Sequence, residues 1–178
     1  MSKRKGTVLI IDDEEAIRES MEMLLNSEGL STVTASDGEE GLSRMEENLF
    51  DLVLLDLTLP GKSGMDVQND IKRIDPSLPV VIITAMAGIE SAVTAIKEGC
   101  FDYVTKPWDN EKLLVIVNNA VKQRQLMSEN TQLRRAFKER FEFSNIVGKS
   151  EPMIKVLDMV SQIAPSRSTV LIQGESGT

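Results

Sequence analysis

Short, unbroken apolar segments recur along the first part of this chain, and they constrain its fold more than any other feature. Residues 8–11, 52–55 and 80–83 are each four apolar residues in a row. Runs without polar alternation are typical of parallel strands that are buried on both faces. Residues 32–35 and 101–104 are weaker candidates, because they include polar residues. The pattern therefore predicts five strands of one parallel sheet.

Between these segments, apolar residues recur at the spacing of one helix face. Gly29 and Gly99 stand where two helices should end, and Ser63 with Asp66 resembles a capping box. Strand and helix alternate through residues 7–121, which predicts an α/β fold, a doubly wound sheet with the strand order 2-1-3-4-5. The helical stripes are Ile17, Met21, Leu24 and Leu25; Leu42, Met45 and Leu49; Val67, Ile71 and Ile74; and Ile89, Val93 and Ile96.

Four of the five predicted strands end in a residue that can handle a phosphoryl group. These residues are Asp12 and Asp13, Asp56, Thr84 and Lys106. The carboxyl ends of parallel strands meet at one edge of the sheet, where ligands of such folds bind. Neighbouring carboxylates there would repel by about 4 kcal/mol per pair at an effective dielectric of about 20, so we expect a compensating cation. Mg²⁺ suits these oxygen ligands, and an ionised Asp can accept a phosphoryl group as a nucleophile.

Each of these residues also has an ordinary structural interpretation. A lone Asp after a strand is often a helix cap, and residues 12–15 could be an acidic helix start. Lys106 could be a loop lysine, Thr84 a hydroxyl that satisfies the backbone, and Tyr103 a core residue. Their combination at the ends of four strands favours the functional interpretation.

The segments LIIDDE at 9–14, LLDLTLPG at 54–61, ITA at 83–85 and YVTKP at 103–107 resemble the receiver domain of two-component response regulators. The resemblance spans Thr7 to about Val121, so residues 1–121 are assigned to a receiver domain. It implies phosphorylation by a sensor histidine kinase with Mg²⁺ as cofactor. It implies a phosphoacceptor, Asp56; metal ligands, Asp12, Asp13, Asp56 and the carbonyl of Thr58; phosphate-binding residues, Lys106, Thr84 and Ala85; a switch pair, Thr84 and Tyr103; and a cis peptide before Pro107.

A long helix is expected to open near Asp109 and to continue to about Arg140, because no Gly or Pro interrupts it. Leu113, Val117, Ala120 and Val121 would dock it on the sheet. Leu126 and Leu133 begin an imperfect heptad pattern, so residues 122–142 are interpreted as a helical linker that forms a coiled-coil dimer, with a solitary solvated helix as the alternative. The receiver resemblance adds the face around residues 88–121 to the expected dimer contacts.

Residues 143–178 resemble the start of the ATPase domain of sigma-54-dependent, NtrC-like enhancer-binding regulators. The resemblance is carried by IVGKS at 146–150 and VLIQGESGT at 170–178, with a helix from Glu151 and a strand over residues 169–172. A partial phosphate loop would comprise Gly174, Glu175, Ser176, Gly177 and Thr178. Because the lysine of that motif falls beyond Thr178, no ATP hydrolysis is expected. Contacts with sigma-54 RNA polymerase and DNA would require further domains.

Charge and cysteine content indicate which classes of function and location to expect for this chain. Residues 1–121 hold 11 Lys and Arg against 22 Asp and Glu, which argues against nucleic-acid binding by this part. A single cysteine, no secretion signal and no apolar run of about 20 residues predict a cytosolic protein without membrane insertion. A phosphorylation-controlled switch that is not itself an enzyme is the leading interpretation. A constitutive dimerisation module with an inert pocket and a hydrolase that forms a transient phosphoenzyme remain alternatives.

Overall fold

The computed structural model describes residues 5–85, 95–140, 150–164, 166 and 169–174. The chain divides into two units, Met1–Ser128 and Glu129–Thr178. The first unit contains the sheet and is the larger of the two. Across the described residues, none of the helices has the length and apolar character required to cross a membrane.

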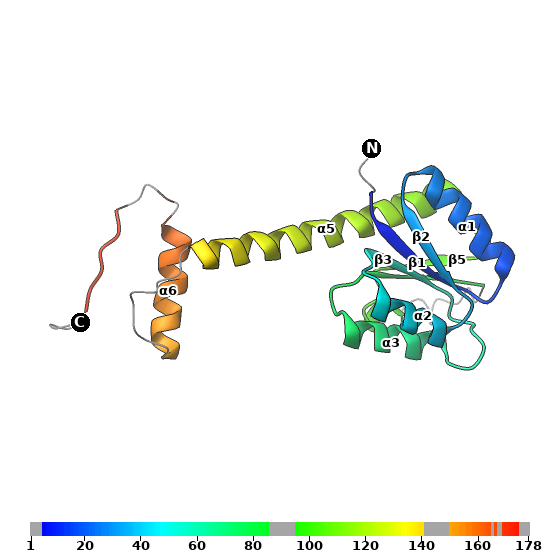
Figure 1. Ribbon diagram of the computed structural model, residues 1–178, viewed down its shortest axis with the longest axis horizontal. Helices are drawn as coiled ribbons and strands as arrows, with labels where there is room; N and C mark the ends of the chain where they lie inside the picture. The colour runs from blue at the N-terminus through cyan, green and yellow to red at the C-terminus, as the bar shows by residue number, and fades with distance from the viewer. Residues whose placement is uncertain (1–4, 86–94, 141–149, 165, 167–168, 175–178) are drawn as a thin grey trace. The chain divides into compact units, whose positions relative to one another are not determined.

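The sheet has five parallel strands in the order β2-β1-β3-β4-β5, as predicted (Figure 1). The strands are β1 (Thr7–Ile11), β2 (Ser31–Ala35), β3 (Leu52–Leu55), β4 (Val80–Thr84) and β5 (Asp102–Thr105). Strand order reverses between β1 and β3, which pair with Ile11 opposite Leu55. The residues that follow these two strands are therefore neighbours at the carboxyl edge of the sheet.

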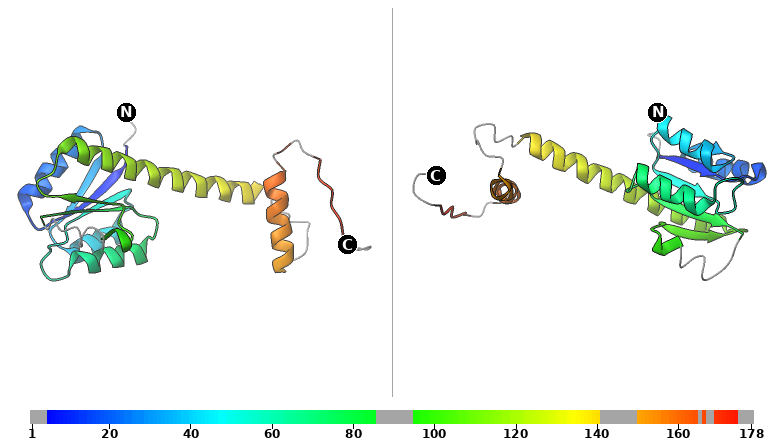
Figure 2. Two further views of the ribbon diagram at one scale, coloured as in Figure 1. Left: turned by 180° about the vertical axis from the view of Figure 1, so that it is seen from behind. Right: turned by 90° about the horizontal axis from the view of Figure 1, so that it is seen from below.

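Helices cover both faces of the sheet, which explains why the central strands are apolar without alternation. Val8 and Ile10 of β1 join a core with α1 (Glu15–Ser27) and α5 (Asn110–Arg140). Leu9 and Ile11 point to the other face and join a core with α2 (Gly38–Glu47) and α3 (Gly64–Ile74). Figures 1 and 2 show these two helix layers on opposite sides of the sheet.

Local side chains set the ends of most of these helices. Asp37 accepts a hydrogen bond from the Glu40 N–H at 2.8 Å, and Ser63 Oγ accepts one from the Asp66 N–H at 3.2 Å. The Asp66 carboxylate in turn accepts from the Ser63 hydroxyl at 2.7 Å, so the predicted pairing of these residues is confirmed. Gly29 has a φ of 83°, a left-handed conformation that glycine adopts without strain after α1.

Three positions of the predicted apolar stripes are not in the core. Leu49 lies beyond the end of α2, and Leu49, Ile74 and Ile96 are 92%, 55% and 58% exposed. Periodicity places a residue on a helix face but does not reveal where the neighbouring layer ends. Ile89 and Val93, with most of the predicted fourth helix, lie outside the described residues; residues 95–97 are helical.

Helix α5 confirms the expected long helix. It spans 31 residues, about 46 Å at about 1.5 Å per residue. The Asp109 carboxylate caps it by accepting from the Glu111 N–H at 2.9 Å, and the four predicted docking residues, from Leu113 to Val121, are buried. Leu126 and Leu133, the two heptad positions, are 57% and 63% exposed.

The second unit contains one further described helix, α6 (Glu151–Ile163), which begins at the predicted residue and has Pro152 in its first turn. The prediction of a strand over residues 169–172 is wrong. These residues have no regular structure, and Leu171 and Ile172 are 81% and 83% exposed. A strand is stabilised by hydrogen bonds to a neighbouring strand, and the described part of the chain provides none for this segment.

Helix α5 is also held by an ion pair with the loop that precedes β4. Arg124 contacts the carboxylate of Asp75 through both Nη atoms, with Nη1 at 3.3 Å from Oδ1, and it also contacts Ser77. Burial raises the pKa of Asp75, but hydrogen bonds from Ser77 and Arg124 outweigh this effect and hold that pKa below 3.8. The ion pair therefore favours the folded state at neutral pH.

We expect Arg124→Met to lower the free energy of unfolding by about 1 kcal/mol at pH 7. Because the pKa of Asp75 is lower in the folded state, this stabilisation is present above pH 3.8 and is lost as pH falls through the folded-state value. Urea unfolding at several pH values measures it. Arg73→Met is the control, since Arg73 is 80% exposed in its pair with Asp70. Equal effects of the two substitutions would contradict the prediction.

Candidate functional site

Two buried carboxylates lie at the carboxyl edge of the sheet, where β1 and β3 end. Asp12 is 1% exposed and Asp56 is 4% exposed. The N–H of Asp12 donates to Ala35 O at 3.2 Å, and that of Asp56 donates to Ile11 O at 2.9 Å. Their positions are thus set by continuation of the parallel ladders. Asp13 is exposed beside them, and the three residues each offer a carboxylate oxygen within 4.8 Å of the others.

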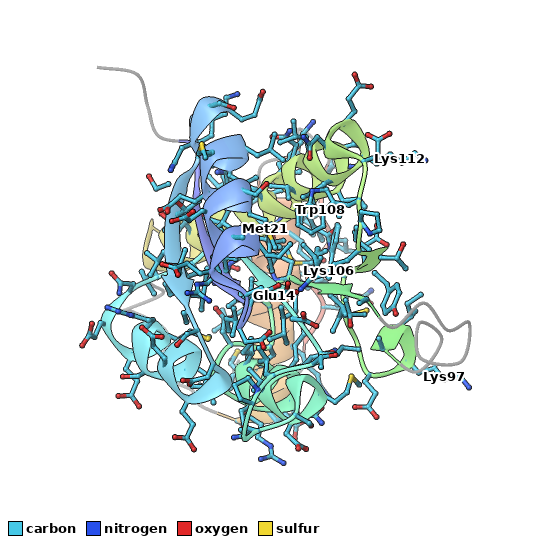
Figure 3. All side chains as sticks on the ribbon, turned by 90° about the vertical axis from the view of Figure 1, so that its right-hand side faces the viewer. Glu14, Met21, Lys97, Lys106, Trp108 and Lys112 are labelled. Carbon is cyan, nitrogen blue, oxygen red and sulfur yellow. The ribbon has the colours of Figure 1, made fainter. Side chains whose placement is uncertain are left out.

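Lys106 brings a positive charge into this cluster from the end of β5. Its Nζ lies 2.7 Å from Asp12 Oδ2, 2.6 Å from Asp56 Oδ2 and 3.1 Å from Glu14 Oε1. Lys106 and Glu14 are labelled in Figure 3. Burial lowers the pKa of Lys106, but its hydrogen bonds to the carboxylates outweigh burial and raise that pKa above 10.5. The ammonium is therefore charged at neutral pH and offsets part of the carboxylate repulsion.

Asp12 has acceptor capacity that the surrounding protein does not use. Its Oδ1 accepts from the Glu14 N–H at 3.0 Å. Its Oδ2 is buried and lies in the ion pair with Lys106, yet among the described residues it has no hydrogen bond of regular geometry. Burial raises the pKa of Asp12, and the contacts with Lys106 and the Glu14 N–H only partly oppose this. A cation bound at Oδ2 would favour the ionised form.

The donor set fits the predicted magnesium ion. Asp12, Asp13 and Asp56 supply hard oxygen ligands, two of them buried, at mutual distances that one ion can span. Thr58, the fourth predicted ligand, lies next to them, because its N–H donates to Asp56 Oδ1 at 2.9 Å. Bound Mg²⁺ would neutralise carboxylate charge and attract a phosphoryl group.

The remaining predicted residues lie on β4 and β5. Thr84 is fully buried at the end of β4, and its carbonyl accepts from the Lys106 N–H at 2.9 Å. Ala85 follows and is exposed. Tyr103 lies on β5, half-buried against the core on the α2 and α3 side of the sheet. The predicted cis peptide between Lys106 and Pro107 is confirmed.

The predicted partial phosphate loop is a separate segment, and only its first residue is among the described residues. Gly174 is exposed and has no regular structure. Glu175, Ser176, Gly177 and Thr178 lie outside the described residues. The segment therefore remains a prediction from sequence.

Three residues that contribute to the site were not identified from the sequence. Glu14 contacts Lys106, although its position suggested only an acidic helix start. Arg18 Nη1 donates to Asp12 O at 2.7 Å and to Asp13 O at 3.0 Å, which fixes the loop after β1. Gly64 packs directly on the backbone of Asp56. Only the run of acids at residues 12–15 gave a signal for any of the three.

We expect Lys106→Met to lower the free energy of unfolding by about 3 kcal/mol without Mg²⁺, because it leaves Asp12 and Asp56 buried without a cation. Added Mg²⁺ should stabilise this variant more than the wild type. Thermal unfolding with and without Mg²⁺ measures both effects. Lys112→Met, at an exposed position on α5, is the control (Figure 3). Unchanged stability of Lys106→Met would show that the ion pairs contribute little.

The strand order, the two helix layers and the acidic edge with its lysine define a receiver-like α/β fold. The family described as "Response regulator receiver domain" matches residues 8–118, and the chain belongs to this family. The fold and the family predicted from sequence are thereby confirmed.

Similarity to known regulators extends over the whole chain. The chain is 34% identical over 178 residues to the transcriptional regulatory protein ZraR of Klebsiella oxytoca, and the match covers 100% of this chain and 39% of ZraR. It is 33% identical over 177 residues to the DNA-binding transcriptional regulator NtrC of Escherichia coli K12, covering 98% and 36% of the two chains. The recognition of an NtrC-like response regulator is confirmed, and the chain spans less than two fifths of these relatives.

Solved structures of response regulators match the fold of this chain. A response regulator receiver domain protein from Clostridium thermocellum matches with a TM-score of 0.65 and 37% identity, covering 68% of this chain and 98% of the other. NtrX from Brucella abortus, solved in complex with ATP, matches with a TM-score of 0.69 and 32% identity, covering 92% of this chain and 36% of NtrX. The similarity to NtrX therefore continues beyond the receiver domain.

Proposed function

We propose that this chain is a phosphorylation-controlled signalling switch in which Asp56 accepts a phosphoryl group from a sensor histidine kinase. The observation that carries this proposal is the position of Asp56. Its carboxylate is buried beside Asp12 and Asp13, with Oδ2 at 2.6 Å from the Lys106 ammonium. A carboxylate of this kind, next to a cation and a metal-binding set, is suited to become an acyl phosphate.

In the proposed transfer, Asp56 Oδ2 forms a bond to phosphorus while the bond from phosphorus to the donor breaks and its electron pair leaves with the donor. Lys106 lies close enough to neutralise charge on the transferring oxygens. Thr84 and Ala85, at the end of β4, would supply further contacts to the phosphate. Mg²⁺ bound by Asp12, Asp13, Asp56 and Thr58 would offset the carboxylate charge.

We further propose that phosphorylation changes the oligomeric state. Thr84 and Tyr103 would act as the switch pair, since they lie on adjacent strands and Tyr103 sits half-buried against the core. The affected face would include residues 88–121, and α5 runs from this part of the chain into the linker without a break. A shift of α5 could then alter a dimer formed through residues 122–142.

The rest of the proposal concerns a longer regulator. Residues 1–121 are assigned to the receiver, 122–142 to the linker and 143–178 to the start of a sigma-54-dependent ATPase domain. The proposal includes a cytosolic location. It also includes contacts with sigma-54 RNA polymerase and with DNA, both made through other domains.

The direct test is incubation with Mg²⁺ and a small acyl phosphate. Intact mass spectrometry should show the gain of one phosphoryl group, and peptide mapping after borohydride reduction should place it on Asp56. Chelation of Mg²⁺ should prevent the gain. A phosphoryl group on another residue, or none under any of these conditions, would refute the proposal.

The alternative of a constitutive dimerisation module is favoured by one observation, the exposure of Leu126 and Leu133 on α5. Two such leucines seven residues apart could pair with a second copy whether or not Asp56 is modified. Light scattering with and without beryllofluoride and Mg²⁺ separates the two functions. A mass that changes supports the switch, and an unchanged dimer supports the alternative.

A further inference from the structure

Lys106 contacts two carboxylates of the metal-binding set and also Glu14, which lies outside that set. Asp12, Asp56 and Glu14 all lie within 3.1 Å of its Nζ. An ammonium group has three N–H donors. Two of them donate to Glu14 and Asp56, and Asp12 Oδ2 lies 2.7 Å away in an ion pair. A phosphoryl group on Asp56 would bring further acceptor oxygens to the same ammonium and would compete with these contacts.

Glu14 is the carboxylate that can leave most easily. Its side chain is 61% exposed, whereas those of Asp12 and Asp56 are 1% and 4% exposed. A released Glu14 would be hydrated at once, because its side chain already borders solvent. Asp12 would instead remain buried without its cation, which is far more costly.

The position of Glu14 is not explained by the helix that it precedes. Glu14 is the N-cap residue of α1, yet its side chain makes no capping hydrogen bond. Short side chains such as those of Asp37 and Ser63, which cap α2 and α3, are preferred at this position. Glu14 instead contacts Lys106, 92 residues away in sequence. A departure from a local preference at the edge of a candidate site favours a role there.

We propose that Glu14 is a positioning residue that competes with the phosphoryl group for Lys106. In the unmodified receiver it holds the ammonium beside Asp12 and Asp56, and it yields its contact when Asp56 is phosphorylated. Glu14 thereby opposes phosphorylation and sets how readily the receiver is switched. This inference rests on the proposed function of Asp56.

The test uses the full chain, saturating Mg²⁺ and beryllofluoride, which mimics the phosphoryl group. Trp108, the single tryptophan, lies two residues from Lys106 and provides a fluorescence signal (Figure 3). Glu14→Gln should bind beryllofluoride about three- to tenfold more tightly than wild type, as expected for loss of an exposed competing charge. Glu15→Gln is the matched control, since it removes the same charge from the next exposed residue.

A third variant, Glu14→Asp, separates contact from charge. It keeps the negative charge but shortens the side chain, which should favour capping of α1 over contact with Lys106. We expect it to bind beryllofluoride more tightly than wild type, as Glu14→Gln does. Wild-type affinity in Glu14→Asp would mean that the charge acts without the contact and would overturn the proposal.

The proposal is also overturned if Glu14→Gln binds no more tightly than wild type, or if Glu15→Gln shows the same gain. A metal titration without beryllofluoride checks that saturating Mg²⁺ is reached in every variant. Failure of the wild type to take up a phosphoryl group on Asp56 would refute the proposed function. Uptake by wild type with no difference in Glu14→Gln would refute this inference alone.

Discussion

Asp56→Asn is expected to abolish phosphoryl uptake from a small acyl phosphate, with a loss of at least about a thousandfold, because the amide lacks the anionic nucleophile. The fold should persist. The amide oxygen can still accept from the Thr58 N–H, as Asp56 Oδ1 does at 2.9 Å. Loss of the contact with Lys106 is offset by less repulsion with Asp12, so we expect a stability change within about 1 kcal/mol.

Intact mass spectrometry measures the uptake, and urea unfolding measures stability. Asp66→Asn is the matched control, because Asp66 is an exposed aspartate on α3 and lies outside the acidic edge. It should be phosphorylated like wild type. Uptake by Asp56→Asn at the wild-type rate would remove Asp56 from the mechanism, whatever the geometry around it.

Gly64→Ala is expected to lower the free energy of unfolding by about 3 kcal/mol and to impair phosphorylation. A Cβ at this position would lie 2.3 Å from the carbonyl oxygen of Asp56 and 2.5 Å from Leu57 Cα. Both atoms belong to the backbone, so no side-chain rotation can relieve the clash. The chain that carries Asp56 must move, and a displacement of about 1 Å in a reacting group can reduce the rate about 100-fold.

The control for this effect is Gly41→Ala on α2. A Cβ there would lie 2.4 Å from Ile11 Cδ1 and 2.9 Å from Ile11 Cγ1, which are side-chain atoms. A shift of this side chain, unlike a clash with backbone atoms, does not require the chain at Asp56 to move, and alanine favours helix over glycine by about 1 kcal/mol. We therefore expect a smaller loss of stability and normal phosphorylation. Wild-type stability and phosphorylation in Gly64→Ala would show that this backbone contact is not required.

Much of the fold was predictable from local patterns. The apolar runs identified three of the five strands, and the weaker candidates over residues 32–35 and 101–104 identified the other two. The confirmed helix ends at Ser63 and Gly29 rest on a hydrogen bond and on a backbone conformation within a few residues. The acidic edge could be predicted as well, although Asp12 and Asp56 are far apart in sequence. Parallel strands align their carboxyl ends, so the residues that follow adjacent strands must meet.

Predictions failed where the burial of a residue or the pairing of a strand depended on a neighbouring element of the structure. Leu49, Ile74 and Ile96 follow the helical period, but the packing layers do not reach them, and they are exposed. Residues 169–172 have the composition of a strand but no pairing partner among the described residues. Neither outcome is encoded in a window of neighbouring residues.

The residues of this chain specified its strands, its helices and the acids and lysine at one edge of the sheet, because periodicity and chain direction act over short distances. Its three-dimensional packing specified the contact of Glu14 with Lys106, the hydrogen bonds from Arg18 to the carbonyls of Asp12 and Asp13, and the close approach of Gly64 to Asp56. These are distances between separate elements, set by how the layers fit together, and no local pattern reports them.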